Sequence, residues 1–116
     1  MKKILVVDDE PGITLLLRKF LSRSDFGVTE ANSGQEALSV LDKNGSFDLV
    51  ILDNKMPGIS GKEVVKTIRD RKMDVRVILL TGSLGEAEGT VEADIFLRKP
   101  LDLNVLLKKI NELLNA

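Results

Sequence analysis

The sequence predicts a parallel α/β fold in which five strands alternate with five helices, (βα)5, as one domain over residues 1–116. Three observations lead to this prediction. Apolar runs such as residues 4–7, 49–52 and 77–80 are continuous, as in strands that are buried on both faces of a parallel sheet. Segments with helical spacing separate these runs, and right-handed crossovers place such helices on both faces. Polar or turn residues end each run, at the sheet edge where α/β proteins bind ligands.

The first half of the chain shows the alternation clearly. After the strand at 4–7, a helix begins at Pro11, because proline suits the first helical position. Helical spacing predicts the inward face of this helix: Ile13, Leu16, Leu17, Phe20 and Leu21. Residues 28–31 form a shorter, more polar strand, which is typical of a sheet edge. A capping-box pattern at 33–36 starts the second helix, which ends near Lys43.

The second half continues the pattern with one weak element. A second capping box at 60–63 starts the third helix, whose inward positions include Val64, Val65 and Ile68. The segment 83–94 predicts only a short fourth helix, because its two glycines each cost about 1 kcal/mol relative to alanine. Residues 95–97 form the last strand. Asp102 can cap the final helix, with the apolar stripe Leu103, Leu106, Leu107, Ile110, Leu113 and Leu114.

Composition excludes several classes of function. With 43% apolar and 30% charged residues, the chain is expected to be soluble and globular. Seventeen basic and eighteen acidic residues without a basic block argue against a nucleic-acid partner. The lack of cysteine fits a reducing cytoplasm, and no segment is apolar enough for a membrane span, so we expect a cytoplasmic protein. The lack of histidine excludes the usual zinc sites and Ser-His hydrolase chemistry.

The ends of separate strands carry the candidate functional residues. Asp8 and Asp9 follow the first strand, Asp53 follows the third, Thr81 ends the fourth and Lys99 follows the fifth. In a parallel sheet these groups meet at one edge. At about 4 Å and an effective dielectric near 20, each pair of like charges costs roughly 4 kcal/mol, which a divalent cation would relieve. Oxygen ligands favour Mg²⁺ or Mn²⁺, and a lysine nearby suits a phosphoryl group.

Simpler interpretations exist for each residue taken alone. Acids favour helix N-termini, so Asp8 and Asp9 could merely cap the first helix. The Thr81 hydroxyl could cap the next segment, and Lys99 could be a solvated loop lysine. Capping does not explain Asp53 and Lys99 at other strand ends, which favours the cation site. The peptide bond before Pro100 is a candidate for the cis form, although only about 5–6% of such bonds adopt it.

Taken together, these residues resemble those of a response-regulator receiver domain, over essentially the whole chain. The matching positions are residues 5–9, Asp53 with Met56, Pro57 and Gly61, Thr81 with Gly82, and residues 93–100. Their order and spacing make the match specific. The resemblance implies a flavodoxin-like, doubly wound sheet with strand order 2-1-3-4-5.

The resemblance also implies a phosphoacceptor rather than an enzyme acting on other substrates. Asp53 would accept a phosphoryl group from a phosphohistidine on a sensor histidine kinase or a histidine phosphotransfer protein. Asp8, Asp9 and Asp53, with the backbone carbonyl of Lys55, would hold Mg²⁺ or Mn²⁺. Lys99 would pair with the phosphoryl oxygens.

Further implied roles concern switching and docking. Thr81 and Phe96 would act as the switch, altering the surface of the fourth helix, the fifth strand and the fifth helix. The bond between Lys99 and Pro100 would be cis. Pro57 and Pro100 would contact the kinase or phosphotransfer partner, while the output partner stays open. The interval from Thr81 to Lys99 is a few residues shorter than in most family members, within the fourth helix that many receivers use to dimerise.

Two hypotheses concern single side chains. Lys55 lies two residues after the acceptor, where a side chain overhangs the phosphoryl site, so it is expected to tune the rate of hydrolysis. A solvated lysine without kinetic effect is the alternative. Leu15 points away from the apolar stripe of the first helix and is expected to dock a partner helix. Single exposed leucines are common, so this exposure alone does not identify a docking site.

Three other functions fit the architecture less well. A flavin-binding electron carrier needs a hydroxyl- and glycine-rich phosphate loop after the first strand, where this chain has acids. An aspartyl-phosphate phosphohydrolase has its nucleophile on the first strand and a second acid two residues later. Asp8 and Glu10 have that spacing, but no cap domain accompanies them. A receiver that has lost phosphorylation would serve only as a binding module, yet every acceptor-site residue is present.

Overall fold

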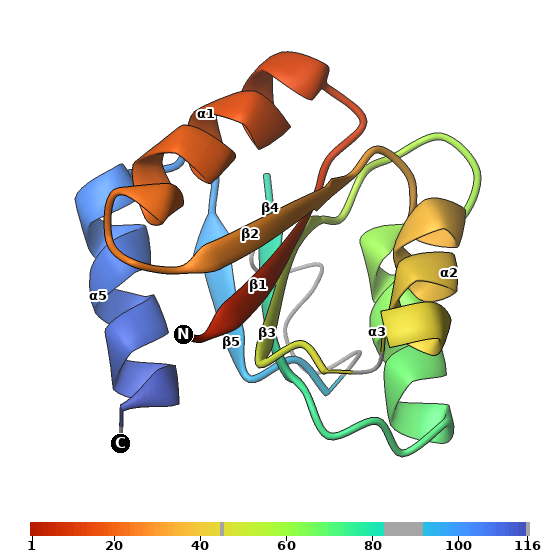
Figure 1. Cartoon of the computed structure of the whole chain (residues 1–116). Coiled ribbons are helices and arrows are strands. Elements are labelled where there is room, and N and C mark those ends of the chain that lie inside the picture. Colours follow the sequence, from red (N-terminus) through yellow and green to blue (C-terminus); the bar gives the residue numbers. More distant parts are fainter. Residues whose placement is uncertain (45, 83–91, 116) are drawn as a thin grey trace.

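The computed structural model describes residues 1–44, 46–82 and 92–115, in which strands and helices alternate (Figure 1). The elements are β1 (Lys3–Val7), α1 (Pro11–Ser22), β2 (Gly27–Ala31), α2 (Gly34–Asn44), β3 (Leu49–Asp53), α3 (Gly61–Asp70), β4 (Arg76–Thr81), β5 (Ile95–Arg98) and α5 (Leu103–Leu114). The predicted fourth helix falls largely on residues 83–91, outside the described residues.

All five strands are parallel and lie in the order β2-β1-β3-β4-β5, so the predicted topology is confirmed. The more polar β2 is an edge strand, as its composition predicted. The register aligns the strand ends: Val7 lies beside both Ala31 and Leu52, and Leu52 lies beside Leu79. Residues that follow these positions therefore meet at one carboxyl edge.

Both faces of the sheet are covered, which explains the continuous apolar runs. Figure 1 shows α1 and α5 on one side of the sheet and α2 and α3 on the other. Alternate residues of each strand enter one of two cores. Leu5, Val50 and Leu79 belong to the core under α2 and α3. The core under α1 and α5 contains neighbouring strand residues such as Ile4, Ile51, Ile78 and Leu80.

The predicted inward face of α1 is wrong at one residue. Leu17 and Leu21 are buried and Ile13 and Phe20 are partly buried, but Leu16 is 49% exposed. Leu16 lies about 100° around the helix from Leu17, at the margin of the contact with the sheet. Thr14 is buried instead, and its hydroxyl donates to Pro11 O at 3.0 Å. The contact is therefore centred closer to Thr14 than the apolar pattern predicted.

The helix starts follow the predicted capping chemistry. Ser60 and Glu63 form a full capping box at α3. At α2 the predicted capping box is only half formed. Ser33 Oγ accepts a hydrogen bond from Glu36 N at 3.0 Å, but the Glu36 carboxylate accepts from Asn32 N, one residue before Ser33, at 2.6 Å. Asp102 caps α5. Among the described helices, none has both the length and the apolar character needed to cross a bilayer.

Candidate functional site

Three carboxylates meet at the carboxyl edge of the sheet. Asp8 and Asp9 follow β1 and Asp53 ends β3, and one carboxylate oxygen from each lies within 4.8 Å of the others. Asp8 and Asp53 are only 2% and 5% exposed, whereas Asp9 is exposed. The cluster arises because β1 and β3 are adjacent in the sheet and pair up to Val7 and Leu52.

Asp8 has one satisfied carboxylate oxygen and one unsatisfied one. Its Oδ1 accepts a hydrogen bond from Glu10 N at 3.0 Å. Its Oδ2 is buried and has no hydrogen-bond partner among the described residues. Burial raises the pKa of the Asp8 carboxyl, the Glu10 hydrogen bond opposes this rise, and the negative charge of Asp53 adds to it. A buried anionic oxygen without a donor is a suitable ligand for a cation.

Lys99 supplies the positive charge of the site. Its Nζ lies 2.9 Å from Asp53 Oδ1, and its backbone N donates to Thr81 O at 2.9 Å. The peptide bond from Lys99 to Pro100 is cis. Burial alone would lower the pKa of Lys99, but the hydrogen bond to Asp53 and the negative charges of Asp53 and Asp8 raise it overall. The ammonium is therefore held charged beside Asp53.

Thr81 and Phe96 lie on the two strands beyond β3. Thr81 ends β4 and is 4% exposed, beside the acidic cluster at the same sheet edge. Phe96 pairs with Leu79, is partly buried, and packs against the core under α2 and α3. Thr81 therefore lies at the carboxyl edge, and Phe96 lies on the neighbouring strand, against the core under α2 and α3.

The loop between β3 and α3 borders the cluster. Lys55 and Pro57 are exposed on this loop. Sequence analysis missed Asn54, whose side-chain Oδ1 accepts a hydrogen bond from Lys62 N at 3.1 Å. An asparagine directly after a strand-ending acid was the only sequence signal for this bond.

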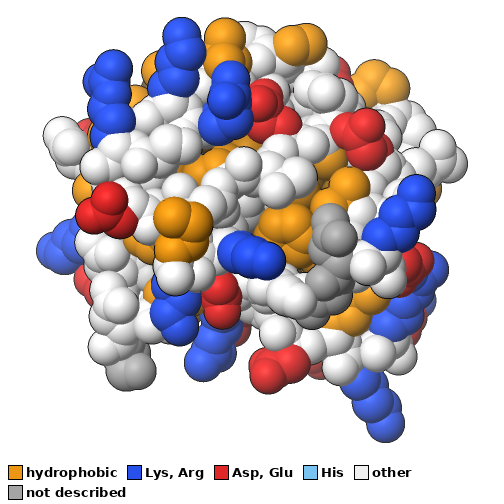
Figure 2. Space-filling view, viewed as in Figure 1, with side chains coloured by type: hydrophobic (Ala, Val, Ile, Leu, Met, Phe, Trp, Pro, Cys, Tyr) orange, Lys and Arg blue, Asp and Glu red, His pale blue; other side chains and the backbone are white. Residues whose placement is uncertain are grey.

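An apolar groove lies beside the acidic site. A cavity of about 320 Å³ separates α1 from the segment that follows β5, and it is lined by Ile13, Leu16, Leu17, Leu80, Lys99, Pro100, Leu101 and Leu103. Leu15 is 39% exposed on the same helix, as predicted, and the exposed Leu16 lines the groove. On the face seen in Figure 2, basic and acidic side chains are interspersed around apolar side chains near the centre.

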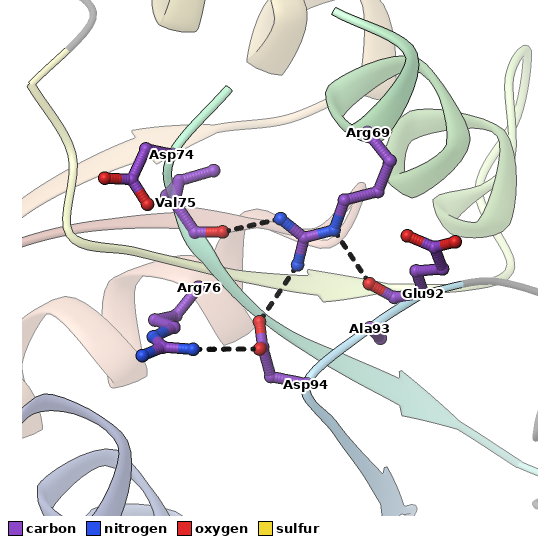
Figure 3. Close-up of a pocket in the computed structure, with 7 residues that line it drawn as sticks. All are labelled: Arg69, Asp74, Val75, Arg76, Glu92, Ala93 and Asp94. Atoms are coloured by element: carbon purple, nitrogen blue, oxygen red, sulfur yellow. Dashed lines mark hydrogen bonds and ion pairs between the residues drawn. The ribbon is translucent and has the colours of Figure 1, made fainter. Parts of the chain in front are cut away.

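A second cavity, of about 420 Å³, lies at the opposite, amino-terminal edge of the sheet (Figure 3). It is lined by Arg69, Asp74, Val75, Arg76, Glu92, Ala93 and Asp94. Arg69 donates to Val75 O at 2.9 Å and Glu92 O at 2.8 Å, and it bonds the Asp94 carboxylate at 3.0 Å. Because the Arg69 and Asp94 side chains bond each other and neighbouring backbone groups, we assign this pair a structural role.

Comparison with known proteins identifies the family. The family profile described as response regulator receiver domain matches residues 4–111. Response regulator SaeR of Staphylococcus aureus (strain USA300) is 33% identical over 118 aligned residues, which cover 98% of this chain and 51% of SaeR. The chain therefore spans about half the length of the curated relatives it matches.

Solved structures agree with this assignment. Response regulator TrrA of Thermotoga maritima, solved with Mg²⁺-BeF, is 41% identical with a TM-score of 0.89, covering 98% of this chain and 100% of TrrA. The structure of histidine kinase ThkA in complex with TrrA contains a chain that is 43% identical, with a TM-score of 0.88 and coverage of 98% and 99%. Chemotaxis protein CheY4 of Vibrio cholerae is 32% identical, with a TM-score of 0.88 and coverage of 98% and 99%. Sequence, sheet order and these matches agree, and the chain belongs to the response regulator receiver domain family of two-component signalling.

Proposed function

We propose that this chain is a phosphoacceptor in a cytoplasmic two-component or phosphorelay pathway, and that Asp53 receives the phosphoryl group. The observation that carries the proposal is the setting of Asp53: a nearly buried carboxylate, 2.9 Å from the Lys99 ammonium and within 4.8 Å of two further carboxylates. In the reaction, an Asp53 oxygen bonds to phosphorus while the bond from phosphorus to the partner's imidazole nitrogen breaks. The electron pair of the broken bond stays on that nitrogen, which takes up a proton from solvent.

The residues at this edge fit a divalent cation. The unpartnered Oδ2 of Asp8 and the mutual repulsion of the three carboxylates both favour one. We propose that Asp8, Asp9, Asp53 and the backbone carbonyl of Lys55 hold Mg²⁺ or Mn²⁺, which when bound neutralises charge on the phosphoryl oxygens. The structure of TrrA with Mg²⁺-BeF supports this proposal by similarity.

The remaining residues would position and sense the phosphoryl group. Lys99 is already 2.9 Å from Asp53 and would transfer its hydrogen bond to a phosphoryl oxygen. Thr81, at the end of the adjacent strand, would donate a hydrogen bond from its hydroxyl to another phosphoryl oxygen. Phe96 would move with Thr81 and change the surface around β5 and α5, because phosphorylation adds about −1.5 to −2 charges at the site.

Mass spectrometry after incubation with Mg²⁺ and acetyl phosphate tests this function. We expect wild type to gain one phosphoryl group, and Asp53→Ala and an EDTA-treated sample to gain none. Phosphorylation of Asp53→Ala to the wild-type level would overturn the assignment of the acceptor. Steady turnover of a generic phosphoester would instead indicate a phosphohydrolase, and a yellow protein with bound flavin would indicate an electron carrier.

We further propose that a histidine kinase or histidine phosphotransfer protein docks over α1 and the two prolines near the site. Leu15 is exposed on α1, and Pro57 and Pro100 are exposed on loops that flank Asp53 and Lys99. The structure of TrrA with histidine kinase ThkA supports a partner of this kind. Leu15→Arg should slow transfer from a phosphorylated partner and leave phosphorylation by acetyl phosphate unchanged. Equal slowing of both reactions would contradict a docking role.

Lys55 has a separate proposed role. Its side chain is exposed and lies two residues after Asp53, so we propose that it limits the access of water to the phosphoryl group. Lys55→Ala should then lose its phosphoryl group faster than wild type, which the decrease of the phosphoprotein mass signal with time measures. An unchanged rate would reject the proposal.

A further inference from the structure

Asn54 joins both ends of the loop between β3 and α3. Its backbone N donates to Leu80 O on β4 at 2.9 Å, and its backbone O accepts from Gly61 N at 2.8 Å. Its side-chain Oδ1 accepts from Lys62 N at 3.1 Å. Both Asn54 oxygens therefore bind the first turn of α3, where backbone N–H groups have no partner within the helix.

The approach of the two loop ends is close. A Cβ atom on Gly61 would lie 2.5 Å from Asp53 O and 2.8 Å from Asn54 Cα, so only glycine allows this contact. Within the loop, Gly58 adopts a φ of 81°, which glycine also favours. The backbone between Asn54 and Gly61 is thus closed at its base by two hydrogen bonds, one of which depends on the Asn54 side chain.

We infer that the Asn54 side chain is a positioning residue for the cation site. The inference rests on the proposed function, in which the backbone carbonyl of Lys55 is a ligand. Lys55 follows Asn54 directly and has an exposed side chain, so its backbone depends on the neighbouring anchor for a fixed position. Groups that orient a ligand commonly change metal affinity by 10–100-fold when they are removed.

Isothermal titration with MgCl₂, without any phosphodonor, measures this effect on the intact chain. Asn54→Leu keeps the approximate size and removes the acceptor, and we expect its Kd for Mg²⁺ to rise about 10-fold. Asn54→Asp keeps an acceptor oxygen at the same place, so its Kd should equal the wild-type value or fall below it. Urea unfolding of each metal-free variant measures the change in stability independently of the change in Mg²⁺ affinity.

Thr67→Val is the matched control on the same helix. Thr67 Oγ1 donates to Glu63 O at 2.9 Å, so the variant also loses one side-chain hydrogen bond of α3, away from the loop. It should lower stability slightly and leave the Kd for Mg²⁺ unchanged. If Asn54→Leu does not fold, Asn54→Ala replaces it with the same expectation.

The outcomes separate the inference from the function on which it rests. A wild-type Kd in the folded Asn54→Leu or Asn54→Ala variant would overturn the positioning role, as would an Asn54→Asp variant as weak as Asn54→Leu. Failure of the wild-type chain itself to bind Mg²⁺ would instead overturn the proposed cation site. An increase in Kd for Asn54→Leu together with an unchanged Thr67→Val would support the inference.

Discussion

Asp8 keeps a carboxylate oxygen in the interior without a hydrogen bond from any described residue. Such an arrangement is unfavourable in the cation-free protein, because a buried polar group without a partner costs about 1–3 kcal/mol. Lys99 offsets the charge of Asp53 through a direct ion pair, but it makes no such pair with Asp8 among the described residues. At the scale of single residues, Asp8 is therefore the group of this site that lowers the stability of the cation-free protein.

Asp8→Asn should make the metal-free protein more stable and weaken Mg²⁺ binding. The amide keeps an acceptor for Glu10 N and removes the charge that repels Asp53. We expect the free energy of unfolding in EDTA to rise by about 1–3 kcal/mol, and the gain to shrink when Mg²⁺ is added. Urea unfolding measures both values. Asp9→Asn, at an exposed position, should give a smaller gain, and a less stable Asp8→Asn protein would contradict the explanation.

Gly61 and Gly12 allow the same glycine-to-alanine substitution to be compared at a crowded and at an open position. Gly61→Ala places a Cβ 2.5 Å from Asp53 O, and we expect a loss of roughly 1–3 kcal/mol in the free energy of unfolding. Gly12 lies in α1, and apart from its chain neighbours and the nearby backbone of the helix no atom lies within 4 Å of an added Cβ, so Gly12→Ala should gain about 0.4–1 kcal/mol. Thermal unfolding followed by circular dichroism compares the two. Equal changes in both variants would mean that the contact at Gly61 is not restrictive.

At the scale of elements, the sequence predicted the features that depend on neighbouring residues, namely the strands and the helix starts. The strands were predictable because a sheet covered on both faces requires uninterrupted apolar runs. The helix starts at Ser60 and Asp102 were predictable because capping involves residues two or three apart. The exact rotation of α1 was not predictable, since the position of Leu16 depends on how α1 meets α5 and the sheet. Asn54 and Arg69 were missed because their partners are set by the tertiary fold.

Arg69 illustrates such a tertiary contact and yields a prediction for α3. Its guanidinium joins the end of α3 to the residues just before β4 and β5, through the carbonyls of Val75 and Glu92 and the Asp94 carboxylate. The side chains of Arg69 and Asp94 are only 24% and 21% exposed. Because hydrogen bonds to charged groups contribute about 1.5–3 kcal/mol, Arg69→Leu should lower the free energy of unfolding by roughly 2 kcal/mol. Urea unfolding measures the loss.

The control is Arg71→Leu at the end of the same helix. Arg71 pairs with Asp42 at 2.7 Å, but both side chains are about half exposed, at 44% and 51%. Exposed ion pairs contribute about 0–1 kcal/mol, so this variant should change stability little. A larger loss in the free energy of unfolding for Arg71→Leu than for Arg69→Leu would contradict the stabilising role given to the interactions of Arg69.

At the scale of the whole molecule, the site exists only when the sheet is complete. Asp8 and Asp9 follow β1, Asp53 ends β3 and Lys99 follows β5, so up to 91 positions of sequence separate groups that meet at one edge. The unfolded chain cannot hold these carboxylates together. A cation that binds the cluster must therefore bind the folded state preferentially and stabilise it.

Mg²⁺ should therefore raise the unfolding temperature of the whole chain. At a free concentration of 100 times Kd, the expected stabilisation is about 2.7 kcal/mol. For a domain of this size that corresponds to an increase in Tm on the order of 10 °C. Differential scanning calorimetry with increasing MgCl₂, at an ionic strength held constant with NaCl, measures the increase. The double variant Asp9→Asn with Asp53→Asn lacks two of the three carboxylates and should show almost no response. An equal increase in that variant would mean that Mg²⁺ stabilises the protein elsewhere, and the carboxyl edge would then lose its assignment as the cation site.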